Sequence, residues 1–104
     1  MGDSLWRVRS FSKVVRQQVG FELELVQGGF EPTDWKPMPA VGSGVREIRV
    51  RVEGEHRIFY VAKFQRAVYV LHAFAKKTQK TPRAAIDLAR SRYREMLRME
   101  GSKI

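Results

Sequence analysis

The sequence predicts an α+β fold in which two helices flank an antiparallel sheet. An amphipathic helical pattern covers residues 12–27, three strand patterns follow one another between residues 46 and 74, and a second helical pattern begins after residue 82. A chain of 104 residues is long enough for one domain and leaves little room for a second core. We therefore expect residues 1–104 to form a single domain.

The first helix is predicted by apolar residues that recur three or four positions apart. Ser10 or Ser12 is suited to cap it, and Gly28 is suited to end it. Residues 21–25 alternate between apolar and acidic side chains, which is a strand pattern, but the longer helical period is preferred. Residues 5–8, before the helix, are expected to form a short strand. The apolar positions of the helix are Val14, Val15, Val19, Leu23 and Val26.

The middle of the chain predicts a meander of three strands. Residues 31–44 contain three prolines and two glycines, so an irregular connection is expected there. Apolar and polar positions then alternate from residue 46 to 52 and from 56 to 63, around a hairpin turn at 53–55. A turn at 65–66 leads to a more apolar strand over 68–74. Such strands form an antiparallel sheet with one face on a core.

The second helix is predicted to start at Thr81 and Pro82. A hydroxyl side chain suits the N-cap, and proline suits the first helical position. Five arginines are spread over the positions that do not face the core. The apolar residues at helical spacing are Ile86, Ala89, Tyr93, Met96 and Leu97.

The net charge of +9 is unevenly distributed along the chain. Residues 1–45 carry five basic and five acidic side chains, whereas residues 46–80 carry nine basic and three acidic ones. A basic half next to a neutral half suggests a surface that meets a polyanion, with nucleic acid as the expected partner. The alternative is that the charge serves only solubility.

Several classes of function are not supported by the sequence. The absence of cysteine excludes disulfides, a thiol nucleophile and thiolate metal sites. The two histidines, His56 and His72, lie on different predicted strands without a carboxylate motif, so no metal site and no cofactor are expected. No glycine-rich phosphate loop, secretory signal or membrane-length apolar run occurs, and we expect a cytoplasmic protein without a membrane partner.

The candidate site is a group of basic residues on neighbouring strands. Arg49 and Arg51 share one strand face, and Arg57 begins the next strand across the short turn. Facing residues of an antiparallel pair lie about 4.5–5.5 Å apart, so like charges there need an anion or counter-charges. The strands predict either a phosphate-binding face or a set of ion pairs, with Glu47, Glu53 and Glu55 as the counter-charges.

A second basic group, residues 76–80, directly follows the third predicted strand. Alone it is typical of a solvated loop, but together with the arginine strands it suggests a rim that binds phosphate. His72 is predicted to be a buried histidine, with catalysis as the alternative. Metal-free RNA cleavage would suit such a site, because a lysine among cations has a lowered pKa and arginine stabilises developing phosphate charge.

Three segments resemble the phage-derived, HigB-like branch of the RelE/ParE toxin superfamily. They are residues 44–50 (GVREIRV), 57–60 (RIFY) and 70–82 (VLHAFAKKTQKTP), and residues 34–38 (DWKPM) also look like members of this branch. The resemblance covers residues 35–95 and is most specific over 71–82. It implies a RelE-like fold with an N-terminal and a C-terminal helix packed on a small twisted antiparallel sheet.

The resemblance also implies a function and its residues. It suggests a type II toxin that cleaves mRNA in the ribosomal A site and is neutralised by a cognate helix-turn-helix antitoxin. Two strand arginines and the two lysines after the last strand match catalytic positions, and other basic residues are expected to bind RNA. The catalytic candidates are Arg49, Arg57, Lys76 and Lys77; the RNA-binding candidates are Arg46, Arg51, His72 and Lys80.

The sequence departs from the toxins it resembles in two places. Glu47 stands where well-studied RelE-like members have a second basic residue, so the general base is left open. No tyrosine closely follows Lys76 and Lys77, and Tyr93 is expected to pack in the core, as is Tyr60. ParE-like proteins of the same fold act on DNA gyrase. The alternatives are therefore a gyrase inhibitor or an inactive RNA-binding prophage remnant.

Overall fold

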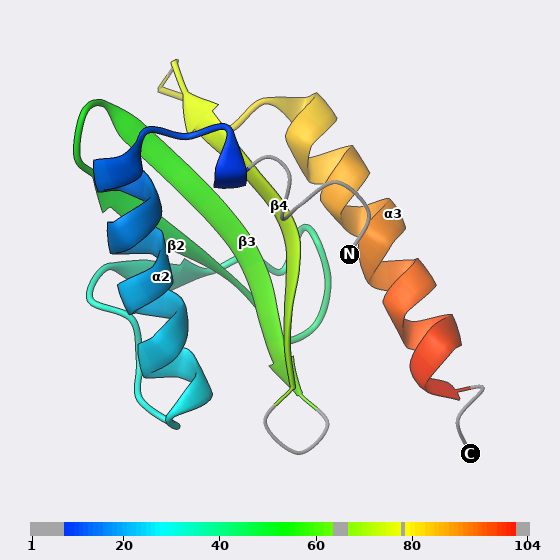
Figure 1. The fold of residues 1–104 in the computed structure, drawn as a ribbon. Helices are drawn as coiled ribbons and strands as arrows, with labels where there is room; N and C mark the ends of the chain where they lie inside the picture. The colour runs from blue at the N-terminus through cyan, green and yellow to red at the C-terminus, as the bar shows by residue number, and fades with distance from the viewer. Residues whose placement is uncertain (1–7, 64–66, 78, 102–104) are drawn as a thin grey trace.

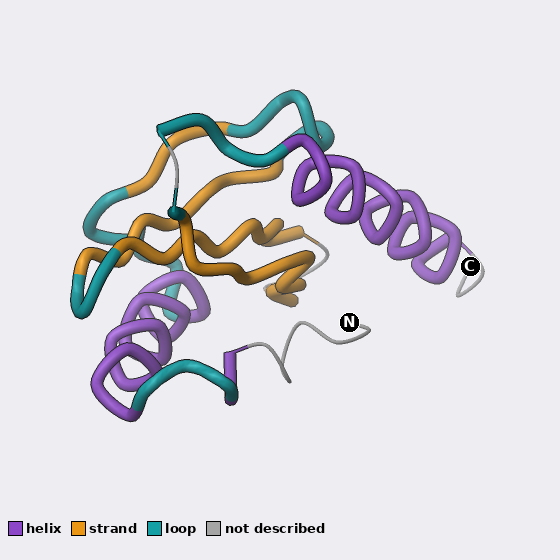
Figure 2. The backbone as a smooth tube through the Cα atoms, turned by 90° about the horizontal axis from the view of Figure 1, so that it is seen from above, coloured by secondary structure: helices purple, strands orange, loops and turns teal. Residues whose placement is uncertain are grey.

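The fold is a four-stranded antiparallel sheet with one helix on each face (Figures 1 and 2). The computed structural model describes residues 8–63, 67–77 and 79–101. The strands lie in the order β1-β2-β3-β4, and the expected α+β class is confirmed. The elements in chain order are α2 (Lys13–Gln27), β1 (Trp35–Pro37), β2 (Val45–Arg51), β3 (Glu55–Lys63), β4 (Ala67–Lys76) and α3 (Arg83–Gly101).

Helix α2 begins and ends where the sequence predicts. The Ser12 side chain caps it by accepting a hydrogen bond from the Val15 N–H at 3.4 Å, and the Gly28 N–H closes its last turn. The helical period overrides the strand-like alternation of residues 21–25, since Phe21 is 51% exposed whereas Glu22 is buried. The Glu22 carboxylate accepts a hydrogen bond from the Thr33 N–H at 2.8 Å, which ties the following loop to the helix.

Strand β1 is the element that the sequence did not predict. It has three residues, Trp35–Pro37, inside the segment expected to be irregular, and it pairs with residues 46–48 of β2. Pro37 is tolerated because β1 lies at the edge of the sheet, where a missing N–H breaks no inner ladder. The strand expected over residues 5–8 is not confirmed, because Val8 is helical and residues 5–7 lie outside the described residues, as does the predicted turn at 65–66.

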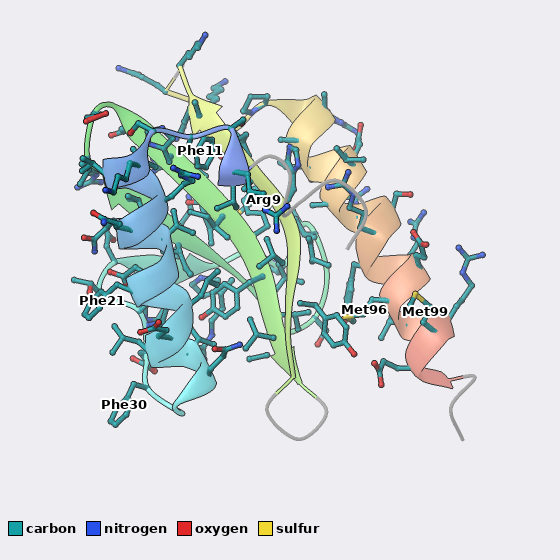
Figure 3. All side chains as sticks on the ribbon, in the orientation of Figure 1. Arg9, Phe11, Phe21, Phe30, Met96 and Met99 are labelled. Atoms are coloured by element: carbon teal, nitrogen blue, oxygen red, sulfur yellow. The ribbon has the colours of Figure 1, made fainter. Side chains whose placement is uncertain are left out.

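Each face of the sheet carries its own apolar core. The core under α2 is formed by Val15, Val19, Val26, Ile48, Val50, Ile58, Tyr60 and Ala73. The core under α3 is formed by Met38, Val41, Val45, Phe59, Val61, Leu71, Ala85, Ala89, Tyr93 and Met96. Phe21 and Phe30 belong to neither core and lie on the outer side of α2 and its following loop (Figure 3).

Helix α3 begins at Arg83, one residue later than expected, after the Pro82 carbonyl accepts the first helical hydrogen bonds. Arg92 donates to the Leu71 carbonyl at 2.8 Å and so fixes the helix on β4. Leu97 is predicted to be a core residue but is 43% exposed, because it lies on the outer side of the helix, next to Met96, which fills the core and is 1% exposed. None of the helices in the described segments is long and apolar enough to cross a membrane.

Gly42 is required by the packing of the loop before β2 against α3. A Cβ atom at this position would lie 2.8 Å from Cζ of Tyr93 and closer still to two other ring carbons. Gly42→Ala should therefore lower the free energy of unfolding by about 1–3 kcal/mol, measured by urea denaturation. Gly20→Ala is the matched control: a Cβ there meets nothing within 4 Å inside α2, so a gain of about 0.5–1 kcal/mol is expected. Equal stability of the two variants would contradict this assignment.

His56 makes the stability of the fold depend on pH. It is buried against Phe11, with ring centroids 4.7 Å apart, and burial lowers its pKa below the ordinary 6.5 despite opposing effects of Val50 and Glu53. The unfolded chain therefore binds a proton at His56 more readily than the folded chain does. Stability should be fully present above pH 6.5 and should fall as the pH drops below it. Urea titrations between about pH 7 and pH 5 should show a smaller decrease for His56→Gln than for the wild-type protein.

Candidate functional site

Strand register places the candidate residues in rows across the face of the sheet that α3 partly covers. Paired residues of adjacent strands point to the same face, so each row brings together side chains from β2, β3 and β4. The row nearest the β2–β3 turn and the next row hold most of the charges. The three rows are Arg51, Glu55 and Lys76; Asp34, Arg49, Arg57 and Phe74; and Lys36, Glu47, Phe59 and His72.

A buried ion pair lies at the centre of these rows. The side chains of Glu47 and Arg57 are 1% and 5% exposed, and Oε1 of Glu47 lies 3.6 Å from Nε of Arg57. Glu55 approaches Nη2 of Arg57 at 3.1 Å, and Lys36 approaches Glu47 at 3.9 Å. Arg57 is therefore enclosed between two carboxylates, and its guanidinium is closed to a substrate in this conformation.

The outer arginines of the same face are accessible and also paired. Nε of Arg49 lies 3.3 Å from the Asp34 carboxylate, and Arg51 lies between Asp34 and Glu55 at 3.8 and 3.6 Å. The side chain of Arg49 is 25% exposed and that of Arg51 is 58% exposed. We call Arg49, Arg51 and Arg57, with Asp34, Glu47 and Glu55, the arginine cluster.

The arginine cluster agrees with the counter-charge alternative for two of the three glutamates. Glu47 and Glu55 pair with arginines, whereas Glu53 accepts a hydrogen bond from the Ser12 hydroxyl at 2.8 Å. The third carboxylate of the cluster is Asp34, which is not among the counter-charges that the sequence predicts. Its only signal in the sequence is its place next to Trp35, because the contact depends on the unpredicted pairing of β1.

The lysines extend the basic side chains beyond the arginine cluster. Lys76 ends β4 opposite Glu55, is half-buried and shares the face of Arg57. Lys77 follows the strand and is exposed, as is Lys80. Within the described segments, neither Lys76 nor Lys77 has an ion pair, so their ammonium groups are the cations of this region that no carboxylate holds.

Two of the RNA-binding candidates do not belong to this surface. His72 is 4% exposed and stacks on Phe74 with ring centroids 5.3 Å apart, which agrees with a buried histidine rather than an RNA contact. Arg46 points to the opposite face of the sheet, because it pairs with Tyr60 and alternates with Glu47 along β2. Its guanidinium stacks on the Trp35 ring, 4.0 Å from the centroid.

The arrangement suits electrostatic binding of a phosphate and metal-independent chemistry by side chains. Arginine offers paired donors in a plane, and lysine offers a mobile charge that can also transfer a proton. An incoming phosphate would compete with Asp34 and Glu55, which are 38% and 44% exposed, for Arg49 and Arg51. In the described residues, no three His, Asp or Glu side chains come together as a metal-ligand set.

Removing Arg57 should damage the fold as well as any activity. Arg57→Ala leaves Glu47 buried with Lys36 alone, so the free energy of unfolding should fall by about 3–5 kcal/mol. Arg49→Ala is the matched control on the facing strand position, where greater exposure limits the expected loss to about 1 kcal/mol. Urea denaturation followed by circular dichroism measures both, and a loss of less than 1 kcal/mol for Arg57→Ala would argue against a structural ion pair.

Comparison with known proteins gives the family of the chain. No curated protein matches the sequence. The family model described as phage-derived protein Gp49-like (DUF891) matches residues 7–94, which include all the strands and most of α3. This family is associated with RelE-like toxins, so the resemblance is confirmed at that level, and membership is compatible with a toxin of a toxin–antitoxin system. The chain belongs to the phage-derived Gp49-like family.

Proposed function

We propose that this protein is the toxin of a type II toxin–antitoxin system and inhibits translation by cutting mRNA in the ribosomal A site. The proposed reaction is metal-independent cleavage of RNA in the cytoplasm. The proposed partners are the ribosome with its mRNA and a cognate helix-turn-helix antitoxin. The finer likeness to HigB-like toxins is part of this proposal, beyond the family assignment itself.

One observation carries the proposal. Arg49 and Lys76 come from strands at opposite sides of β3, yet register places both on the same face around the Arg57–Glu55 pair. The basic positions that the resemblance marks as catalytic therefore lie on one face of the sheet, two strands apart, although Arg49 and Lys76 are 27 positions apart along the chain. A phosphate seated between them would meet cations from two sides.

The chemistry follows from what such cations can do. The 2′-hydroxyl of a nucleotide loses its proton to solvent as its oxygen bonds to the neighbouring phosphorus, and the pentacovalent intermediate gains negative charge. The P–O5′ bond then breaks, the leaving 5′-oxygen takes up a proton, and a 2′,3′-cyclic phosphate remains. Arg49 stabilises the charge on the phosphate oxygens, and Lys76 or Lys77 supplies the proton or a second cation. Arg51 and Lys80 bind the flanking phosphates of the strand.

Arg57 takes a different part in this scheme from the one the resemblance implies. With 5% of its side chain exposed, it orients Glu55 and so sets the charge next to Arg51 and Lys76. Direct contact with the reacting phosphate requires Glu55, which is 44% exposed, to release the Nη2 atom. Arg57 is thus a positioning residue in this conformation, and it becomes a catalytic residue only when a phosphate replaces Glu55 at its Nη2 atom.

Cleavage by purified protein on translating ribosomes tests the function. Primer extension on the mRNA should show cuts in phase with codons, and Lys76→Ala, Lys77→Ala or Arg49→Ala should reduce the rate by roughly 10²–10³-fold where the residue acts on the transition state. Lys→Arg at positions 76 and 77 separates two roles, because arginine keeps the charge but does not release a proton near neutral pH. Arg94→Ala, an exposed arginine of α3 outside the arginine cluster, is the control and should cut like the wild type.

Each outcome of this experiment decides between the candidate functions. Codon-phased cuts that depend on Lys76 or Lys77 support the nuclease. Breaks in DNA that depend on gyrase, with intact mRNA, would assign the protein to the ParE-like mode of action. Ribosome binding without cuts would indicate an inactive RNA-binding remnant. Wild-type cutting by both Lys→Ala variants would show that the lysines are wrongly placed in the mechanism.

A further inference from the structure

Arg46 differs from the three other arginines of the central strands. Arg49, Arg51 and Arg57 each lie within 4 Å of a carboxylate, whereas Arg46 has no such partner within the described segments. Its guanidinium face rests on Trp35, and the N–H groups at its edge lie near the Tyr60 hydroxyl rather than at a carboxylate. Since it lies on the α2 face, it is remote from the proposed catalytic surface on the other side of the sheet.

A cavity of about 400 Å³ opens beside Arg46. It lies between the end of α2 and the sheet, where Val26, Gly29 and Gly44 leave space and Phe30 and Glu31 form part of the wall. Gly29 and Gly44 have positive φ angles of 88° and 79°. Each lies in a turn beside the cavity, and neither adds a side chain to its wall. A volume of this size is within the usual range of small-ligand sites, roughly 300–1,000 Å³.

Tyr60 supplies a second donor to the same cavity. The residue is 1% exposed and lines the cavity, and its hydroxyl lies close to Arg46 but has no acceptor for its O–H within the described residues. Burial is the main cause that raises the pKa of this hydroxyl, and the nearby Arg46 opposes only part of the rise, so the hydroxyl stays protonated and remains a donor at neutral pH. A buried donor without an acceptor costs about 1–3 kcal/mol, which a ligand with an acceptor atom would recover.

We infer that this cavity, which we call the Arg46 cavity, binds one nucleotide unit through its phosphate. The Arg46 guanidinium edge and the Tyr60 O–H converge as donors for the phosphate oxygens. Glu31 is the acceptor for amino groups of the base, and the 69% exposed ring of Phe30 is the surface on which the base stacks. The unit is a free nucleotide or one nucleotide of a single-stranded RNA.

The composition of the cavity favours a nucleotide over a simple anion. A phosphate ion alone would use Arg46 and Tyr60 but would be repelled by Glu31 and would leave the apolar wall of Val26 and Phe30 uncovered. A ligand with an anion at one end and N–H donors on a flat ring at the other uses all of these groups. Bases with an amino group, such as guanine, should therefore bind more tightly than uracil.

This inference goes beyond the proposed nuclease, because it concerns the face of the sheet opposite the arginine cluster. Binding to the Arg46 cavity is measured without ribosomes and does not depend on Lys76 or Lys77. Loss of mRNA cleavage therefore leaves the inference standing, and loss of nucleotide binding leaves the nuclease standing.

Calorimetric titration of the full chain with GMP at low salt tests the cavity. Saturable binding is expected for the wild type, and Tyr60→Phe should weaken it about 10-fold or more by deleting one hydrogen bond to a charged group. The same substitution should leave the free energy of unfolding unchanged or raised, because it removes an unsatisfied buried hydroxyl. If the Tyr60 hydroxyl only stabilises the fold, Tyr60→Phe will lower the free energy of unfolding and leave the affinity for GMP unchanged, and this result would contradict the inference.

Two further comparisons complete the test. Arg46→Gln should weaken GMP binding at least as much as Tyr60→Phe, whereas Arg94→Gln on α3 removes the same charge elsewhere and should bind like the wild type. Tighter binding of a five-nucleotide single strand than of GMP identifies RNA as the source of the unit, and the reverse identifies a free nucleotide. The inference is overturned if the binding isotherm does not reach saturation by about 10 mM GMP. It is also overturned if UMP or inorganic phosphate binds as tightly as GMP, or if an acidic peptide binds more tightly than GMP.

Discussion

The buried ion pair of Glu47 and Arg57 is the constraint on which the charged face of the sheet depends. Removing two opposite charges from water costs several kcal/mol for each ion, and this cost is offset only while both partners remain in place. Lys36 from β1 and Glu55 from β3 complete the set around the pair. Ion pairs between side chains thus link β1, β2 and β3 in addition to the backbone hydrogen bonds. The short edge strand β1 is therefore held both by the pairing of its three residues with β2 and by the Lys36–Glu47 contact.

Successive residues of β2 point to opposite faces of the sheet, so Arg46 lies on the α2 face, whereas Arg49 and Arg51 lie on the α3 face. On the α3 face, an anion that approaches Arg49 or Arg51 must displace a carboxylate that is already in contact, so binding there is an exchange of partners. On the α2 face, Arg46 stacks on the Trp35 ring, and no carboxylate of the described residues forms an ion pair with its guanidinium. The proposed substrate site would thus bind by exchange of partners, which suits a transient substrate, and the proposed nucleotide site would bind through preorganised donors, which suit a retained ligand.

Local patterns in the sequence predict most of the helices and strands, whereas they do not predict contacts between segments that are distant along the chain. Period-two alternation over residues 46–63 predicted β2 and β3 and also the side of the sheet to which each residue points, and Ser12 with Gly28 marked the ends of α2. Strand β1 was missed because a three-residue element between prolines carries no period. The contacts of Asp34 with Arg49 and of Trp35 with Arg46 were missed with it, since both follow from the register of β1.

Glu47 is where the sequence departs from the toxins it resembles, and the structure gives this departure a physical meaning. A basic residue at this position would place a like charge beside Arg57 in the interior, and the repulsion would drive the Arg57 guanidinium toward solvent. Glutamate has the opposite effect, because it holds the Arg57 guanidinium inward at 5% exposure. In the proposed reaction, the cations left to meet a phosphate are then Arg49 and Arg51 on β2 and Lys76 at the end of β4. An acidic residue at the centre of the sheet thus leaves the accessible positive charge at the margin of this face, where the proposed phosphate site lies.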